Sequence, residues 1–476
     1  MKRISGWMVP LVLLAGTTLV LADDVAGLPL HVQRLGDTAI RVWLGDHISS
    51  TAVVAIPTAQ GIVVIDTLGN PVLDREVRKV IARELKRNDF KYLINTHDHI
   101  DHTGGNGVYA DCVIIGHERC GDAVKAALER RKEALKWYEQ RLPELEKEAA
   151  AKPADSPEGK RLREELVVDR LLFDAMKSGE VPPVPTKTFT DRMTLDLGDE
   201  KLELYYIGGM HSASDIAIFV PRQGLLMTGD TMADIWLTDT PGCLQSFMVR
   251  PGIPHDFPLL LENWTLLLAK KDQIKDYVPG HWNGDLSAKG FEDRVNYVRV
   301  LWEGINRDVK AGKDLDALMA EYDLRTKFPG LVNSPGLIPR AHNTSLMAIW
   351  CLLTGSTSAA NRVYELACAG AAPDAFREVV ADRGRKPSRY YFLEMEFNAQ
   401  GYRLLQENKP KEAVTVFRLT SELYPGSWNA WDSLAEGCLK AGDTDQAVKF
   451  YEKSVELNPN NQNGKDALQK IRSASR

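Results

Sequence analysis

The chain has 476 residues, of which 44% are hydrophobic, 26% charged and 8% aromatic. This length exceeds one ordinary domain, and this composition is that of a folded globular protein with two or three domains. The formal net charge is only −6, without a basic stripe or an aromatic-and-arginine platform, which argues against nucleic acid as a partner. Six scattered cysteines without a Cys-x-x-Cys pair indicate neither a disulfide scaffold nor a thiolate zinc site.

The N-terminus has the pattern of an export signal. Two basic residues precede an apolar run over residues 7–21, which ends at Ala22 before an acidic pair. We therefore predict a signal peptide over residues 1–22, a mature chain that begins near Asp23, and a periplasmic or secreted location without membrane attachment after cleavage. The alternative is an uncleaved anchor, although the run is short for a bilayer span.

The first half of the chain alternates short β-rich runs with helical stretches. Strands are expected at 42–44, 51–56, 62–65 and 91–95, a helix over 74–86, and further strands at 202–207, 216–220 and 225–228. This order predicts an α/β or α+β domain whose sheet consists of two halves.

The two groups of strands are separated by a charged, alanine-rich insertion over residues 121–179. Its two helical arms flank a turn-like segment at 152–157, so it is expected to form a helical hairpin. Three roles stay open for it: a lid over the site, an oligomerisation arm, or a solvated surface hairpin.

The C-terminal part repeats itself after 34 residues, which is the tetratricopeptide period. The aligned pairs are Phe397 with Trp431, Gly401 with Ala435, Ala413 with Ala447, Phe417 with Tyr451, and Pro425 with Pro459. A helix over about 463–471 would cap the last repeat. We predict a catalytic domain over 23–325, a helical connecting region over 326–393, and two repeats with a capping helix over 394–476. The repeats would bind a protein partner or mediate self-association.

A compact group of metal-ligand residues follows the expected strand 91–95. It contains His97, His99, Asp101 and His102 within six residues. Zinc prefers imidazole nitrogen and carboxylate oxygen, and alternate residues of an extended loop can point into one cavity. The spacing therefore indicates a metal site at the end of a strand.

A pair of metal ions requires more ligands than this motif supplies. Further candidates stand after other strand-like segments: His211 after 205–210, Asp230 after 225–229, and His281 after 277–280. Strand ends of one sheet edge can bring such residues together.

The segments 96–105, 209–212, 228–230 and 279–281 contain these residues. In their order and context they resemble the metallo-β-lactamase superfamily, and the resemblance covers about residues 31–287. The resemblance implies a four-layer αββα sandwich with the site at one edge, followed here by the all-α tetratricopeptide region. It implies that one zinc ion is held by His97, His99 and His211, the other by Asp101, His102 and His281, and that Asp230 bridges them. Two zinc ions per chain are thus expected, with iron or manganese as other options. Asp66 resembles the family's acidic residue beneath the site, with a role in orienting the loop.

A bridged pair of ions lowers the pKa of a shared water and so provides a hydroxide nucleophile. Asp101 is the expected catalytic residue, because it could orient the hydroxide or pass a proton. A bridging carboxylate at Asp230 resembles the thioesterase, lactonase, phosphodiesterase and sulfatase branches, whereas true β-lactamases of this fold usually carry Cys or Ser there. The sequence thus predicts an exported hydrolase of small molecules with an ester-like bond, whose pocket walls decide the substrate.

Three alternatives stay open at this point. One is a β-lactamase-type amide hydrolase, which the export signal suits. Another is a tetratricopeptide binding scaffold with an inactive hydrolase domain, and the third is a mononuclear iron oxygenase on the same fold. The remaining histidines His117, His255 and His342 lack motif context and are interpreted as surface or helix-end residues.

Overall fold

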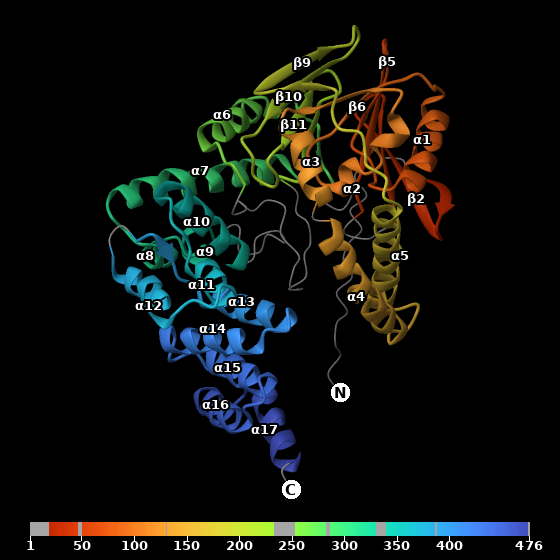
Figure 1. Ribbon diagram of the computed structural model, residues 1–476. Helices are drawn as coiled ribbons and strands as arrows, with labels where there is room; N and C mark the ends of the chain where they lie inside the picture. Colours follow the sequence, from red (N-terminus) through yellow and green to blue (C-terminus); the bar gives the residue numbers. More distant parts are fainter. Residues whose placement is uncertain are drawn as a thin grey trace, which may run out of the picture. The chain divides into compact units, whose positions relative to one another are not determined.

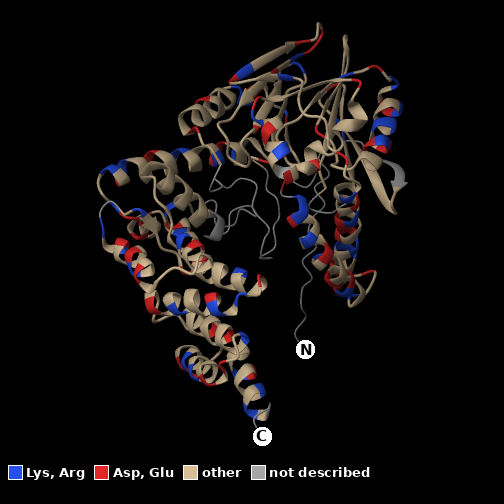
Figure 2. Cartoon of the chain, in the orientation of Figure 1, with Lys and Arg blue, Asp and Glu red and all other residues tan. Residues whose placement is uncertain are grey.

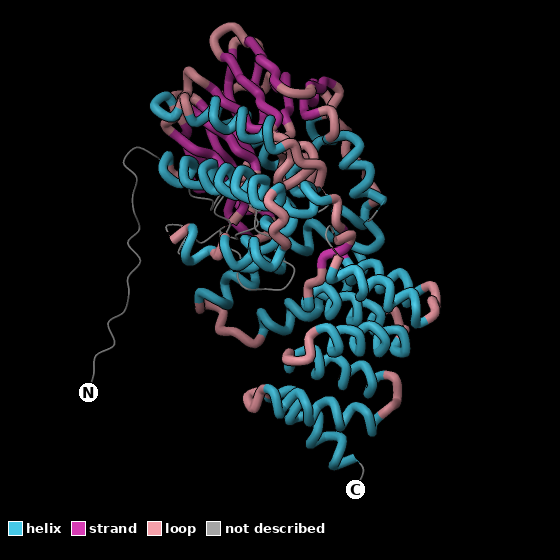
Figure 3. The backbone as a smooth tube through the Cα atoms, turned by 90° about the vertical axis from the view of Figure 1, so that its left-hand side faces the viewer, coloured by secondary structure: helices cyan, strands magenta, loops and turns pink. Residues whose placement is uncertain are grey.

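The computed structural model describes residues 19–45, 50–129, 131–232, 253–281, 286–329, 339–385 and 388–474. The chain divides into two compact units. The sheet unit comprises Met1–Ile305 and Met319–Ile349, and the helical unit comprises Asn306–Leu318 and Trp350–Arg476. Both large sheets belong to the sheet unit, as the magenta strands of Figure 3 show, whereas the helical unit is almost entirely helix.

The first sheet has eight strands that follow one another in chain order. Its strands are β1 (Leu19–Val25), β2 (Leu28–Leu35), β3 (Ala39–Leu44), β4 (Val53–Thr58), β5 (Gly61–Ile65), β6 (Phe90–Ile94), β7 (Val113–His117) and β8 (Lys187–Phe189). Pairing is antiparallel from β1 to β5 and parallel from β5 to β8. All five residues of β5 are buried, as expected for a β-branched strand that is covered on both faces.

The second sheet has five strands in the order β13-β12-β11-β10-β9. Its strands are β9 (Arg192–Asp196), β10 (Lys201–Tyr206), β11 (Ile216–Val220), β12 (Leu225–Gly229) and β13 (Asp276–Pro279). Alternate residues such as Ile56 of β4 and Ile218 of β11 form one apolar cluster between the two sheets, while Val53 and Ala55 belong to a cluster on the other face. This period of two is that of a sheet buried on both faces.

Helices cover the outer faces of the sheets (Figure 1). Helix α1 (Pro71–Leu85) packs Leu73, Val77 and Ile81 on the first sheet, and α6 (Phe257–Leu268) contacts β10 of the second. Trp264 of α6 meets Phe291 of α7 (Ala288–Lys310) with ring centroids 5.4 Å apart. The layers are therefore helix, sheet, sheet and helix, and the expected αββα sandwich is confirmed.

The insertion consists of three helices, one more than the two expected arms. These are α3 (Cys120–Glu129), α4 (Arg131–Ala150) and α5 (Pro157–Ser178), with the expected turn between the last two. Figure 2 shows Lys, Arg, Asp and Glu along α4 and α5. Val167, Val168 and Leu171 of α5 nevertheless pack against the core beneath the first sheet. The insertion is thus attached to the sandwich along α5.

Where the two repeats and the capping helix are expected, the helical unit has two helix pairs and a final helix. They are α13 (Glu394–Gln406), α14 (Pro410–Leu423), α15 (Trp428–Lys440), α16 (Thr444–Leu457) and α17 (Gln462–Ala474). A Cβ on Gly401 would lie 2.3 Å from Phe417, so the aromatic ring occupies the space that the small residue leaves. The helix expected over 463–471 is α17.

The segment between sheets and repeats is mainly helical, as expected. It contains α8 (Leu315–Glu321), α9 (Leu324–Lys327), α10 (Pro339–Thr354), α11 (Ala359–Cys368) and α12 (Pro373–Ala381). A short parallel pair of β14 (Thr357–Ser358) and β15 (Tyr390–Tyr391) was not expected. In the described part of the chain, none of the helices has the length and apolar character needed to span a bilayer.

Strand β1 begins at Leu19 and pairs with β2. It therefore includes the last four residues of the segment expected as a signal peptide, while residues 1–18 lie outside the described residues. Cleavage of that segment stays a prediction.

Candidate metal centre

The candidate ligands leave strand ends at one edge of the sandwich. His97, His99, Asp101 and His102 lie on the loop after β6 and on the short helix α2 (Ile100–Thr103), while Asp230 directly follows β12. His211 and His281 follow β10 and β13. Two backbone hydrogen bonds join the sheets at this edge: Ile216 N–H donates to the Thr96 carbonyl (2.9 Å), and Ala52 N–H to the Gly280 carbonyl (2.8 Å). The structure thus brings all seven residues together.

Asp230 lies at the centre of this group, which we call the cluster. Its Oδ2 is 3.1 Å from Nε2 of His281, 3.5 Å from that of His211, 3.6 Å from that of His102 and 3.9 Å from that of His97. Its side chain is 4% exposed. One carboxylate therefore faces four imidazoles in a nearly closed space, as a bridging ligand would.

The ligand atoms fall into three overlapping groups, within each of which they lie no more than 4.8 Å apart. The groups are His97 with His99 and His211, His97 with His102 and Asp230, and Asp101 with His102 and His281. Two of them coincide with the ligand triads that the sequence predicts, and the third contains the predicted bridge. His99 Nδ1 and His211 Nε2 approach to 2.9 Å, a separation that suits a common cation.

Several polar atoms of the cluster are buried without a hydrogen-bond partner in the described part of the chain. They are Nε2 of His97, Nε2 of His102 and Oδ1 of Asp230. Buried polar atoms are almost always hydrogen-bonded, and an exception calls for an explanation. Neutral imidazole nitrogen and carboxylate oxygen are ligands that divalent ions such as zinc accept. The donor set therefore fits a metal centre.

The electrostatics of the cluster favour positive charge at its centre. Burial alone would raise the pKa of the Asp230 carboxyl, but His281 and His102 hold that pKa well below its usual range. Burial and the neighbouring His102 and His99 hold the pKa of His97 well below its usual value, so its imidazole is neutral. Burial lowers the pKa of His102 and of His281, but the carboxylates around them, Asp230 foremost, raise both by a larger amount. A divalent ion would replace those protons, because metal ligands bind as carboxylate and neutral imidazole.

Asp66 holds the metal loop from below. Its carboxylate accepts hydrogen bonds from the backbone N–H (2.7 Å) and the hydroxyl (2.6 Å) of Thr96, and it lies 3.0 Å from Nδ1 of His102. Thr96 Oγ1 is in turn 3.0 Å from Nδ1 of His97. Both rings are thereby oriented with Nε2 toward the cluster, and these contacts fit the orienting role expected for Asp66. Asp66 has a φ of 60°, a strained conformation for a non-glycine residue.

Asp215 positions His211, although no sequence motif points to this aspartate. Its Oδ2 accepts the backbone N–H groups of Met210 (2.8 Å), His211 (2.7 Å) and Ser212 (2.8 Å). Burial raises the pKa of this carboxyl to about 6, against the lowering effect of these hydrogen bonds. The sequence feature that could have indicated Asp215 is its position four residues after His211. The three backbone N–H groups that donate to it lie on the same loop.

Gly280 shows how closely the cluster is packed. A Cβ at this position would lie 2.3 Å from Oδ1 of Asp230 and 3.0 Å from the His102 ring. Real Cβ atoms do not approach so closely, so any side chain here would displace the carboxylate. The glycine that precedes His281 is therefore required by the site.

His117 and His342 are buried, so a surface position is wrong for both, whereas the expected helix-end position holds for His342 in the first turn of α10. His117 stacks on Tyr206 at 3.6 Å, with Nε2 2.9 Å from the Thr190 carbonyl. Nδ1 of His342 lies 2.9 Å from the Tyr297 hydroxyl. Each is a core histidine with a hydrogen-bond partner. The sequence around it has no hydrophobic periodicity that would distinguish such a residue from one at the surface. His255 is partly buried, and its Nδ1 lies 2.8 Å from the Gly209 carbonyl.

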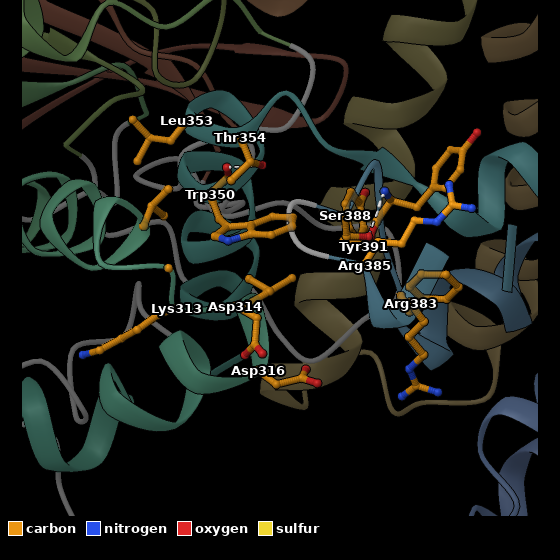
Figure 4. Close-up of a pocket in the computed structure, with 15 residues that line it drawn as sticks. Lys313, Asp314, Asp316, Trp350, Leu353, Thr354, Arg383, Arg385, Ser388 and Tyr391 are labelled. Atoms are coloured by element: carbon orange, nitrogen blue, oxygen red, sulfur yellow. Dashed lines mark hydrogen bonds between the residues drawn. The ribbon is translucent and has the colours of Figure 1, made fainter. Parts of the chain in front are cut away.

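A cavity of about 560 Å³ lies within the helical unit (Figure 4). Trp350 and Leu353 supply apolar surface there, and Asp314, Asp316 and Arg385 supply charge. Its lining contains neither histidine nor cysteine. This cavity therefore lacks the set of metal-ligand side chains found in the cluster, which belongs to the sheet unit.

Comparison with known proteins agrees with this geometry. The family model "Metallo-beta-lactamase superfamily" matches residues 44–281, half of the chain, and "Tetratricopeptide repeat" matches residues 428–461. The chain is 25% identical over 289 residues to the 2,4-dinitroanisole O-demethylase subunit alpha of Nocardioides sp. (strain JS1661), a match that covers 60% of this chain and 65% of that protein. It is 36% identical over 52 residues to the metallo-beta-lactamase type 2 of Bacteroides fragilis, covering 11% of this chain and 21% of that protein. The chain thus spans less than two thirds of either relative's length.

Similar solved structures include the stereoselective inverting sec-alkylsulfatase Pisa1 from Pseudomonas sp., with 15% identity, a TM-score of 0.45 and coverage of 88% of this chain and 64% of that one. Another is a metallo-beta-lactamase from Pontibacter korlensis, with 17% identity, a TM-score of 0.33 and coverage of 59% and 99%. Because the family model covers half of its length, this chain belongs to the metallo-β-lactamase superfamily, whose members are typically hydrolases that bind metal ions.

Proposed function

We propose that the protein is an exported hydrolase that uses two divalent metal ions, zinc foremost, to cleave an ester-like bond in a small molecule. The observation that carries this proposal is the complete cluster, in which both expected triads and the carboxylate between them lie within coordination reach. A degenerate, non-catalytic domain would be expected to have lost at least one of these residues. Two ions held there would activate water and polarise the substrate oxygen.

The chain's own residues have distinct tasks in this reaction. His97 and His102 present their Nε2 atoms toward the cluster, because Thr96 and Asp66 occupy the other ring nitrogen. Asp101 is the carboxylate at the mouth of the cluster, with 29% of its side chain exposed. Burial raises the pKa of Asp101, but His102 and His281 together lower it by a larger amount. As a result, the pKa of Asp101 lies below its usual value. Asp101 is therefore ionised at neutral pH and can accept a hydrogen bond from the attacking water and so orient it.

Two points support an ester-like bond over an amide. A carboxylate stands at position 230, where true β-lactamases of the family usually carry Cys or Ser. In addition, one relative is named an O-demethylase, which is consistent with a substrate whose attacked group is attached through oxygen. We further propose that the tetratricopeptide region binds a protein partner or a second copy, because such repeats generally mediate protein interactions.

The test is a panel of lactone, thioester, phosphodiester, sulfate ester and β-lactam substrates with metal-loaded protein. His97→Ala and Asp230→Ala should each lower hydrolysis by more than the roughly 10–100-fold that outer-shell changes cost, while the far-ultraviolet circular dichroism stays unchanged. His117→Gln is the matched control, because it alters a buried histidine outside the cluster. Full activity of either cluster variant after metal depletion would contradict the proposal.

A further inference from the structure

A second cavity, of about 320 Å³, lies beside the cluster in the sheet unit. One side is lined by the metal loop, including the candidate ligands His99 and Asp101. The other side is lined by the three insertion helices and the segment after them. We call this cavity the insertion pocket. When the scissile bond of a substrate lies at the cluster, the substrate atoms next to that bond would thus lie at the mouth of this pocket.

The wall that the insertion supplies is aliphatic. Its apolar residues are Val124 and Leu128 of α3, Ala134 of α4, Ala175 and Met176 of α5, and Pro182. The two charged residues on this side are Arg131 and Glu180, which have opposite signs. The insertion side of the pocket contains no Phe, Tyr or Trp, so a planar ring would find no ring to stack on in this wall. An uncharged aliphatic group is what such a wall accommodates without a desolvation cost.

The wall is fixed to the sandwich by specific contacts. Asn70 caps α1 with its side-chain oxygen, and its Nδ2 donates to the Leu171 carbonyl of α5 (2.7 Å). Asn106, just after the metal loop, donates from Nδ2 to the Pro183 carbonyl (2.8 Å). Helix α5 and the segment after it are therefore tied to the scaffold that carries the cluster. Specificity needs such rigid support.

We propose that the insertion pocket holds a compact alkyl chain of the substrate, with Ala175 and Met176 as specificity-determining residues. This inference rests on the proposed function and names its substrate class: ester-like molecules with a saturated, uncharged chain. At about 30 Å³ per heavy atom, the share of a water in the liquid, the pocket has room for about ten atoms. The insertion is then a substrate-binding wall. Of the three roles left open for it, a lid over the site is the nearest.

The first experiment measures kcat/KM of the metal-loaded protein for 4-nitrophenyl esters from acetyl to decanoyl. Each methylene that enters the pocket should raise kcat/KM about fourfold until the pocket is full. Ala175→Phe fills the pocket and should end this rise at a shorter chain. Met176→Ala enlarges it and should extend the rise to longer chains. Val181→Phe is the matched control, because Val181 is 62% exposed and does not line the pocket.

Opposite shifts for the two pocket variants, with Val181→Phe like the wild type, support the inference. Equal kcat/KM for all chain lengths, or identical profiles for all variants, overturns it and leaves the proposed function intact.

A second readout does not depend on catalysis. Saturation-transfer nuclear magnetic resonance should detect 1-hexanol bound to the wild type and to Val181→Phe, and a much weaker signal with Ala175→Phe. If 1-hexanol binds in this way but neither these esters nor any member of the lactone, thioester, phosphodiester, sulfate ester and β-lactam panel is hydrolysed, the pocket stands and the proposed function is wrong. If 1-hexanol does not bind to the wild type, or binds equally to Ala175→Phe, the inference is wrong.

Discussion

Each of the two units buries an aspartate, and the surroundings of the two aspartates differ. In the helical unit, Asp382 accepts hydrogen bonds from Ser388 Oγ (2.8 Å) and from the backbone N–H groups of Arg389 (2.6 Å) and Tyr390 (3.1 Å). In the sheet unit, Asp230 leaves Oδ1 without a hydrogen-bond partner among the described residues. The hydrogen bonds of Asp382 come from residues of its own unit. At Asp230, one carboxylate oxygen and the Nε2 atoms of His97 and His102 remain for a metal ion to bind. The comparison teaches that the four imidazoles facing Asp230, in place of the hydroxyl and N–H donors around Asp382, distinguish the candidate metal ligand from a structural carboxylate.

Metal removal should separate the two units most strongly. An ion that binds only the folded state at about 1,000 times its dissociation constant adds about 4 kcal/mol of stability. A chelator should therefore destabilise the sheet unit by about that amount and leave the helical unit unchanged. Hydrogen exchange read by mass spectrometry reports peptides of each unit separately. Equal loss of protection in both units, or no loss in the sheet unit, would break the comparison.

Asp74 of the sheet unit provides a third kind of buried carboxylate. Burial raises its pKa from 3.8 to about 7, against the lowering effect of hydrogen bonds from the backbone of Leu68 and Asn70. The folded state thus binds the proton more tightly than the unfolded state. The stabilisation is fully present below pH 3.8 and is lost as the pH rises through about 7, by at most about 4 kcal/mol.

The variant Asp74→Asn keeps an acceptor for Leu68 and has no charge to bury. In urea titrations between pH 4 and 8, the wild type should lose stability relative to this variant as the pH rises. Parallel stability curves for the two proteins would show that Asp74 stays ionised when folded.

A smaller effect is expected in the helical unit. Asp382→Asn exchanges one acceptor oxygen for a donor that faces N–H groups, which should cost about 3 kcal/mol, on the scale of one or two hydrogen bonds to a charged group. Hydrolysis by the sheet unit should stay unchanged. The control Asp374→Asn alters a carboxylate that is 84% exposed in the same unit and should change stability by less than about 0.5 kcal/mol. A similar cost for both variants would remove Asp382 from the comparison.

The sequence was sufficient for the features that repeat or cluster locally. The metal loop has four candidate ligands within six residues, and the repeats align aromatic and small residues at a fixed offset, so both were predicted together with the αββα sandwich. His211, Asp230 and His281 were found because each follows a strand-like run.

The features that depend on contacts between distant segments were not predicted. Asp215 lacks a motif, and its role appears only when three backbone N–H groups converge on it. The insertion pocket combines residues near 100 with residues near 175, and no local pattern records that proximity. The burial of His117 likewise depends on Tyr206 of the other sheet.

The central claim is that the cluster holds two metal ions through two separate triads. The most direct test is the metal content of the purified protein, measured by mass spectrometry of its elements. The wild type and His117→Gln should retain two zinc ions per chain, and His99→Ala and His281→Ala, each of which breaks one triad, about one. A wild type with fewer than one ion per chain, or two ions retained in both triad variants, would contradict the account.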